Sequence, residues 1–327
     1  MKPRRRLLRS LIIVAAFILI VSILYYIFVY AKVYNSSNIK ENTLIGSKVE
    51  SVYPETTVAY LTSPEKRDAG TRGNAEAAQY IRNYFEALGL KPFQNNTYYQ
   101  RFTAQNLKNS QFKILPVSGE VENVVGKMEG ADSSKAVVIS AHLDSFDSKG
   151  VIDNASGIAA LLEAGKIISQ RLENDVFPID IILAAYNAEE IGLLGSEYFY
   201  QEMTKEYKDF YNINMDCVGV LDKPLAIQNN HLESENIYRD FGEYFDKYNI
   251  PTKDVLYAFD GTEVIGTSDH EIFQNNDRAA IILGEDGLAE IVNTENDNDT
   301  SLLDYSEIIR LSNVVADFVL DSGGRVY

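Results

Sequence analysis

The sequence has a single cysteine, Cys217, no tryptophan and three histidines among its 327 residues. One cysteine excludes an intramolecular disulfide, and with it the small secreted scaffolds that depend on disulfide bonds. It also excludes a structural zinc site built from several cysteines. With 46% hydrophobic and 24% charged residues, the chain has an ordinary globular composition and is long enough to bury a large core.

The chain also has fewer basic than acidic residues. The chain contains 30 lysines and arginines against 47 aspartates and glutamates, which gives a formal net charge of -17. Five of the basic residues lie in the first 31 positions, where there is no acidic residue, so the remainder is more acidic still. Such a surface repels phosphate backbones, and nucleic acid is therefore not an expected partner.

The N-terminal segment carries the longest apolar run, "LIIVAAFILIVSILYYIFVYA", at residues 11–31. At about 1.5 Å per residue, a helix of this length spans the roughly 30 Å hydrocarbon layer of a membrane. It exceeds the 7–15 apolar residues of a typical cleaved signal peptide, although Val29-Tyr30-Ala31 leaves cleavage as an alternative. Arginines before the run place the N-terminus inside.

These features predict four regions. Residues 1–10 are a cytoplasmic basic tail, 11–31 a transmembrane signal anchor, 32–55 a polar stalk, and 56–327 a folded domain outside the plasma membrane. From Lys135, continuous apolar runs alternate with amphipathic segments. This alternation predicts an α/β fold, with a mostly parallel mixed sheet covered by helices on both faces.

Polar side chains follow the predicted strands, where ligands bind in sheets of this kind. The candidates from these loops are His142, Asp144, Asp153, Glu189, Glu190 and Asp216. Imidazole with several carboxylates and no thiolate suits zinc, manganese or cobalt in a hydrolytic site. The excess of carboxylates suggests two ions bridged by a carboxylate. One of the adjacent glutamates would bind metal, and the other would take a proton from water.

The motifs "AHLDS", "DNASG", "NAEEIGLLGS", "NMDCVG" and "TSDHEIF" occur in an order and spacing that resemble the co-catalytic dizinc aminopeptidases. The secreted bacterial leucyl aminopeptidases typify this family, and its relatives include glutaminyl cyclases and the transferrin receptor ectodomain. The resemblance extends from about Tyr60 to the C-terminus. It implies a zinc exopeptidase-like fold, two zinc ions and substrates that are peptides with a free N-terminus.

Residue roles also follow from the resemblance. It implies that His142 and Asp216 bind one zinc, that Asp153 bridges, and that Glu190 binds the second zinc. It makes Glu189 the general base. The resemblance further implies that Asp144 orients the His142 ring through its second nitrogen, and that Asp269 and His270 lie at the substrate rim.

One position departs from the family pattern. The second zinc of the family takes a histidine from a late His-Thr-x-x-Asp stretch, and here that stretch is "VNTENDNDT". Asn293 stands in the place of the histidine, with Thr294 and Asp297 in step; a shifted alignment would put Glu295 there instead. We therefore expect a second metal site that is weakened, or that takes a harder ion such as manganese.

The expected protein is a membrane-anchored extracytoplasmic metallo-aminopeptidase. Two alternatives stay open on the sequence alone. One is a different metal enzyme on the same fold, such as a glutaminyl cyclase or a carboxypeptidase-like hydrolase. The other is a binding ectodomain that has lost catalysis, which the asparagine at position 293 would favour.

Overall fold

A computed structural model describes residues 53–63, 66–103, 120–173, 175–228, 232–255 and 268–327. The predicted tail, anchor and most of the stalk lie outside these residues. Across the part of the chain that is described, no helix is long and apolar enough to cross a membrane. The described residues belong to one compact unit.

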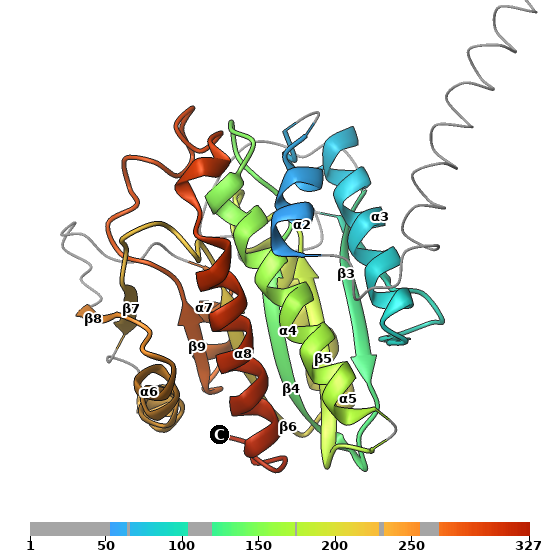
Figure 1. Ribbon diagram of the computed structural model, residues 1–327. Helices are drawn as coiled ribbons and strands as arrows, with labels where there is room; N and C mark the ends of the chain where they lie inside the picture. The colour runs from blue at the N-terminus through green and yellow to red at the C-terminus, as the bar shows by residue number, and fades with distance from the viewer. Residues whose placement is uncertain (1–52, 64–65, 104–119, 174, 229–231, 256–267) are drawn as a thin grey trace, which may run out of the picture. The chain divides into compact units, whose positions relative to one another are not determined.

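A mixed sheet forms the centre of this unit, in the order β1-β3-β5-β4-β6-β9, with β2 also paired to β3 (Figure 1). The strands are β1 Lys91–Pro92, β2 Tyr99–Thr103, β3 Glu120–Met128, β4 Asp132–His142, β5 Ile179–Tyr186, β6 Asp209–Met215 and β9 Ala280–Leu283. β4 is parallel to β5 and β6, and β6 is parallel to β9. The predicted parallel strands are therefore confirmed. β3 is antiparallel to β5, and β1 and β2 each pair antiparallel with β3, so antiparallel strands extend the sheet at one side.

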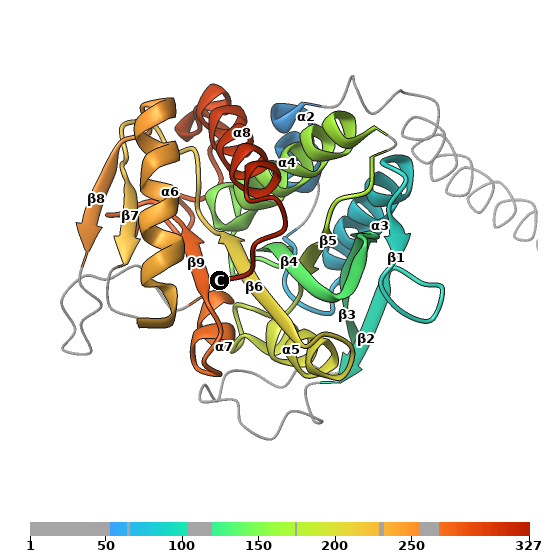
Figure 2. The same ribbon diagram turned by 90° about the horizontal axis from the view of Figure 1, so that it is seen from below.

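Helices cover both faces of the sheet, as the apolar runs predicted (Figure 2). The described helices are α2 Pro54–Leu61, α3 Arg72–Ala87, α4 Gly157–Leu172, α5 Leu194–Glu206, α6 Glu235–Tyr248, α7 His270–Gln274 and α8 Tyr305–Asp321. α2, α3, α4 and α8 lie on one face, and α5 and α7 on the other. α6 packs against α8, beside a small parallel pair, β7 Leu225–Gln228 and β8 Thr252–Val255.

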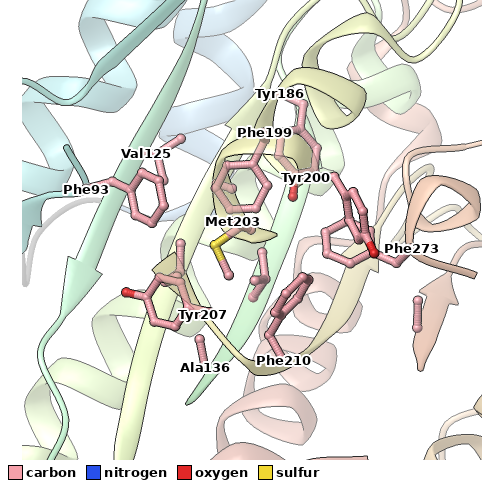
Figure 3. Close-up of a cluster of buried hydrophobic side chains, with 14 residues drawn as sticks. Phe93, Val125, Ala136, Tyr186, Phe199, Tyr200, Met203, Tyr207, Phe210 and Phe273 are labelled. Carbon is pink, nitrogen blue, oxygen red and sulfur yellow. The ribbon is translucent and has the colours of Figure 1, made fainter. Parts of the chain in front are cut away.

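The aromatic side chains of α5 and α7 form much of the second face (Figure 3). Phe199 lies 5.5 Å from Phe93 and 5.3 Å from Tyr186, measured between ring centroids. Phe273 packs edge-on against Tyr200. All eight residues of β5 are buried, because helices cover it from both sides. This packing fixes the carboxyl ends of β4, β5 and β6 at one edge of the sheet, and the polar loops start there.

α2 begins at Pro54, inside the range that the sequence assigned to the stalk. The side chains of Pro54, Val58 and Leu61 are buried against the domain. A proline in the first turn is compatible with a helix, since its missing N–H would have no helical partner there.

Candidate metal centre and active site

His142 is the last residue of β4, and its imidazole is fully buried. Its Nε2 lies 3.0 Å from an oxygen of Asp153 and 3.4 Å from an oxygen of Asp216. Its Nδ1 lies 3.4 Å from Asp144 Oδ1. One nitrogen thus faces two predicted metal ligands, while the other faces the residue predicted to orient the ring.

Asp153 is held by a carboxylate far away in the sequence. The oxygens of Asp297 accept hydrogen bonds from the main-chain N–H groups of Ile152, at 2.6 Å, and of Asp153, at 3.1 Å. The carbonyl of Asp297 accepts a third, from Val151. Because Asp297 is fully buried, these bonds fix the turn that presents Asp153 to His142.

Asp216 directly follows β6. Its Oδ2 accepts a 2.6 Å hydrogen bond from the hydroxyl of Ser268, which in turn accepts one from Asn214. Burial would raise the pKa of Asp216, but the nearby imidazole and this hydroxyl lower it overall. With Oδ2 engaged in this way, Oδ1 is the oxygen turned toward His142.

Glu189 and Glu190 lie in the loop after β5. Their main-chain N–H groups donate to the two oxygens of Asp144, at 3.2 and 3.3 Å. Ligand atoms of both glutamates lie within 4.8 Å of one another and of His142. Burial, followed by the charge of Asp153, raises the pKa of Glu190 to about 10, and burial also raises the pKa of Glu189.

The start of this loop is tied to the rest of the domain by side-chain amides. Asn187 exchanges a pair of hydrogen bonds with Asn74 of α3, at 2.9 and 3.0 Å. Its main-chain N–H donates to the side chain of Asn123 in β3. Nothing in the spacing of the motifs pointed to these contacts, since each partner lies more than 60 positions away.

The donor set fits a cation. Besides Asp144, four carboxylates surround one imidazole, and side-chain burial leaves them little water to offset their mutual repulsion. Neither nitrogen of His142, nor Glu190 Oε1, makes a hydrogen bond of acceptable geometry within the described structure, although all are buried. Buried polar atoms rarely remain without a partner unless an ion or water supplies it. Oxygen and imidazole ligands without thiolate are typical of a catalytic zinc site.

Asp269 and His270 stand at the start of α7, and both side chains are fully buried. Burial raises the pKa of Asp269 to about 7. Its charge acts on Glu189, which places it close to the candidate base. Their role at the substrate rim stays a prediction.

The two residues predicted as alternative ligands of the second metal ion are less buried than the other candidate ligands. Asn293 and Glu295 are both exposed, and the backbone of Asn293 is in the left-handed region with φ 55°. Glu295 belongs to neither of the metal-holding clusters found among the described residues. Asp297, four residues after Asn293, is buried and anchors the turn at residues 151–153 that presents Asp153, which we call the metal loop.

Comparison with known families identifies the chain. Residues 123–319, more than half of the sequence, match the description "Peptidase family M28". The chain belongs to peptidase family M28. This agrees with the zinc aminopeptidase relatives that the motifs suggested.

Individual relatives and solved structures extend the comparison. The aminopeptidase of Pseudomonas aeruginosa is 35% identical over 104 residues, which cover 31% of this chain and 18% of that protein. Leupeptin-inactivating enzyme 1 of Streptomyces exfoliatus is 25% identical over 213 residues, covering 64% of this chain and 42% of the relative. The matched region thus spans less than half the length of either relative.

Solved structures share the fold. LapA aminopeptidase of Legionella pneumophila superposes with a TM-score of 0.66 at 19% identity, covering 89% of this chain and 76% of that one. BSAP, a zinc aminopeptidase from Bacillus subtilis, gives 0.64 at 14% identity, with 86% and 98% coverage. A glutaminyl cyclase from Bacteroides thetaiotaomicron gives 0.62 at 16% identity, with 82% and 97% coverage. The structures that share this fold thus include two aminopeptidases and a glutaminyl cyclase.

Proposed function

We propose that this M28 protein is a zinc-dependent aminopeptidase that removes N-terminal residues from peptides. The observation that carries the proposal is the buried cluster at the carboxyl edge of the sheet. There, His142, Asp153 and Asp216 offer ligand atoms within 4.8 Å of one another, beside Glu189 and Glu190. The matched relatives named as aminopeptidases support peptide substrates.

His142 Nε2, Asp153 and Asp216 would hold the first ion, and Glu190 would contribute to a second. Zinc in such a site polarises a carbonyl and lowers the pKa of a water molecule toward neutrality. Asp144 Oδ1 faces Nδ1 of His142 at 3.4 Å, and a proton shared between these two atoms would leave the lone pair of Nε2 for the metal.

Glu189 would be the general base that transfers the proton of the attacking water. It accepts this proton from the water and returns it to the departing amine, which must leave as a neutral group. The bonds from the Glu189 and Glu190 main-chain N–H groups to Asp144 fix the backbone that carries both glutamates beside His142. Asp144 therefore contacts both the imidazole of His142 and the backbone of the two glutamates, and so positions all three relative to one another.

We also propose that the second metal site is weak. Asn293 would offer only a neutral carbonyl oxygen, a poorer zinc ligand than imidazole, and its side chain is exposed. One tightly bound zinc and one exchangeable ion would result. A binding ectodomain is the alternative that the same asparagine supports. A one-metal enzyme resembling the glutaminyl cyclases is a further alternative, but the asparagine counts against it, because the late histidine is a metal ligand in that family too.

The proposed location is the outer face of the plasma membrane, with residues 11–31 as a single-pass anchor and the N-terminus in the cytoplasm. The length of this uncharged run and the arginines before it support the proposal. The peptide substrates would then be extracytoplasmic.

Peptide digestion tests the activity. The purified protein, loaded with zinc, is incubated with a peptide that has a free N-terminus and with its N-acetylated copy, and products are identified by mass spectrometry. We expect stepwise loss of N-terminal residues from the free peptide alone, and loss of activity on chelation. A third peptide with N-terminal glutamine separates the cyclase alternative, which would release ammonia without shortening the chain.

Glu189→Gln is the matched variant for the mechanism. It keeps the size of the side chain but cannot accept the proton, so turnover should fall by roughly 10²- to 10⁴-fold while zinc stays bound. A variant with near-normal rates would remove Glu189 from the role of general base.

A further inference from the structure

Arg67 is one of the most deeply buried side chains of the domain, with 1% of its surface exposed. Burial lowers the pKa of its guanidinium to about 10, so it stays charged at neutral pH. A buried arginine is rare unless its charge and its N–H groups are matched by partners. The mechanism proposed above does not use it.

The partners of this guanidinium are four main-chain carbonyl groups. Nε donates to Leu143, at 2.9 Å, and Nη2 donates to Gly150, at 3.0 Å. Nη1 donates to Lys149, at 2.5 Å, and to Leu61, at 3.3 Å. Three of the four acceptors therefore lie in one segment, residues 143–150.

This segment joins two predicted metal ligands. It begins after His142 and ends three residues before Asp153. The main chain of Arg67 also binds this segment. The N–H of Arg67 donates to Ser145 Oγ at 3.0 Å, and the carbonyl of Arg67 accepts from Ser145 N at 3.3 Å. One residue thus holds both ends and the middle of the connection between the ligands.

Gly150 shows how closely the guanidinium packs against the ligand turn. Its φ is +57°, and a Cβ placed on it would lie 2.8 Å from Arg67 Nη2 and 2.2 Å from the carbonyl of Asp153. Only glycine fits this position without displacement. The arginine is therefore in close contact with the backbone that presents Asp153.

The charges around Arg67 are those of the metal centre. The acids that act on its guanidinium are Asp144, Asp297, Asp153 and Glu190. Among these are two predicted ligands, the residue that faces the histidine ring, and the anchor of the metal loop. A fixed positive charge in this place offsets part of the repulsion among the buried carboxylates.

We propose that Arg67 is a positioning residue of the metal centre, whose guanidinium fixes the 143–150 segment and thereby the spacing of His142 and Asp153 that gives tight zinc binding. The inference rests on the metal site of the proposed function but not on peptide hydrolysis. Lysine cannot take this role, since a single ammonium cannot reach four carbonyls in the planar fork geometry of arginine.

The test compares the zinc affinity of Arg67→Lys with that of the wild-type full-length protein, by competition with a chromophoric chelator. Arg82→Lys is the matched control, because Arg82 lies on the outer part of α3 and pairs with Glu86. Losing a residue that orients metal ligands typically costs 10- to 100-fold in metal affinity. We expect a loss in that range for Arg67→Lys and less than a twofold change for Arg82→Lys.

A merely structural role predicts a different outcome. Arg67→Lys would then unfold at a lower temperature, but added zinc would raise its melting temperature as much as it does for wild type. Unchanged zinc affinity in a folded Arg67→Lys protein overturns the proposal. If wild type binds zinc but cleaves no peptide, the proposed function fails while this inference stands.

Ser145→Ala keeps the proposal testable should Arg67→Lys not fold. It removes the acceptor of the Arg67 N–H and leaves the guanidinium in place. One hydrogen bond of about 1 kcal/mol corresponds to a roughly fivefold loss of zinc affinity. Affinity equal to wild type in this variant counts against a positioning role for the contact between Arg67 and the segment.

Discussion

Replacing Asp297 with asparagine should destabilise the domain and weaken its metal site together. The carboxylate accepts two main-chain N–H groups, of Ile152 and Asp153, in a fully buried position. In Asp297→Asn, one oxygen can still accept, but the new NH₂ group faces the other N–H. Leaving one buried donor unsatisfied costs about 1–3 kcal/mol.

For a domain of this size, a loss of about 2 kcal/mol corresponds to roughly 4–8 °C in melting temperature. Thermal unfolding at pH 8, with and without zinc, measures it, and chelator competition should show a 10- to 100-fold weaker zinc affinity. Asp299→Asn is the matched control, since Asp299 lies in the same loop, is exposed, and only caps a short turn. Equal melting temperatures and zinc affinities for the two variants would refute the assignment of Asp297 as the anchor of the metal loop.

Four further predictions concern the stability of the domain and the support of its metal site. Gly157→Ala should destabilise by about 1–3 kcal/mol, because its Cβ would lie 2.1 Å from a neighbouring amide oxygen. Gly242→Ala, in open space on α6, should stabilise by about 0.5–1 kcal/mol, and urea titrations of unfolding measure the change for both glycine variants. Ion pairs and hydrogen bonds offset burial and hold the pKa of Asp317 at about 2. Its stabilisation is thus complete above about pH 4 and lost as the pH falls toward 2, and Asp317→Asn should flatten that part of a pH series of unfolding curves. Ser268→Ala should lower zinc affinity roughly tenfold in chelator competition, by freeing Asp216 Oδ2.

The sequence was informative where local pattern decides structure. Continuous apolar runs predicted β4, β5, β6 and β9, and the polar residues after three of them predicted the edge where the site would form. The structure brings His142, Asp153 and Asp216 together there. This succeeded because parallel strands place their carboxyl ends at one edge, whatever the helices between them do.

Contacts between distant segments were beyond the reach of these patterns. Asp297 and Asp153 are 144 positions apart, and the four acceptors of Arg67 are backbone carbonyls, which leave no trace in residue identity. The antiparallel pairing of β1 and β2 with β3 was also missed, since β1 and β2 are short. The sequence suggested which residues could bind a metal, but not which ones hold those ligands in place.

The zinc content of wild-type protein and of His142→Ala tests the central claim most directly. After equilibration with zinc and removal of free ion, elemental analysis should find at least one tightly bound zinc per wild-type chain and a clear loss in the variant. A second zinc that washes out more readily would agree with the weak site expected at Asn293. Equal zinc content in wild type and His142→Ala would contradict a metal centre built on this histidine.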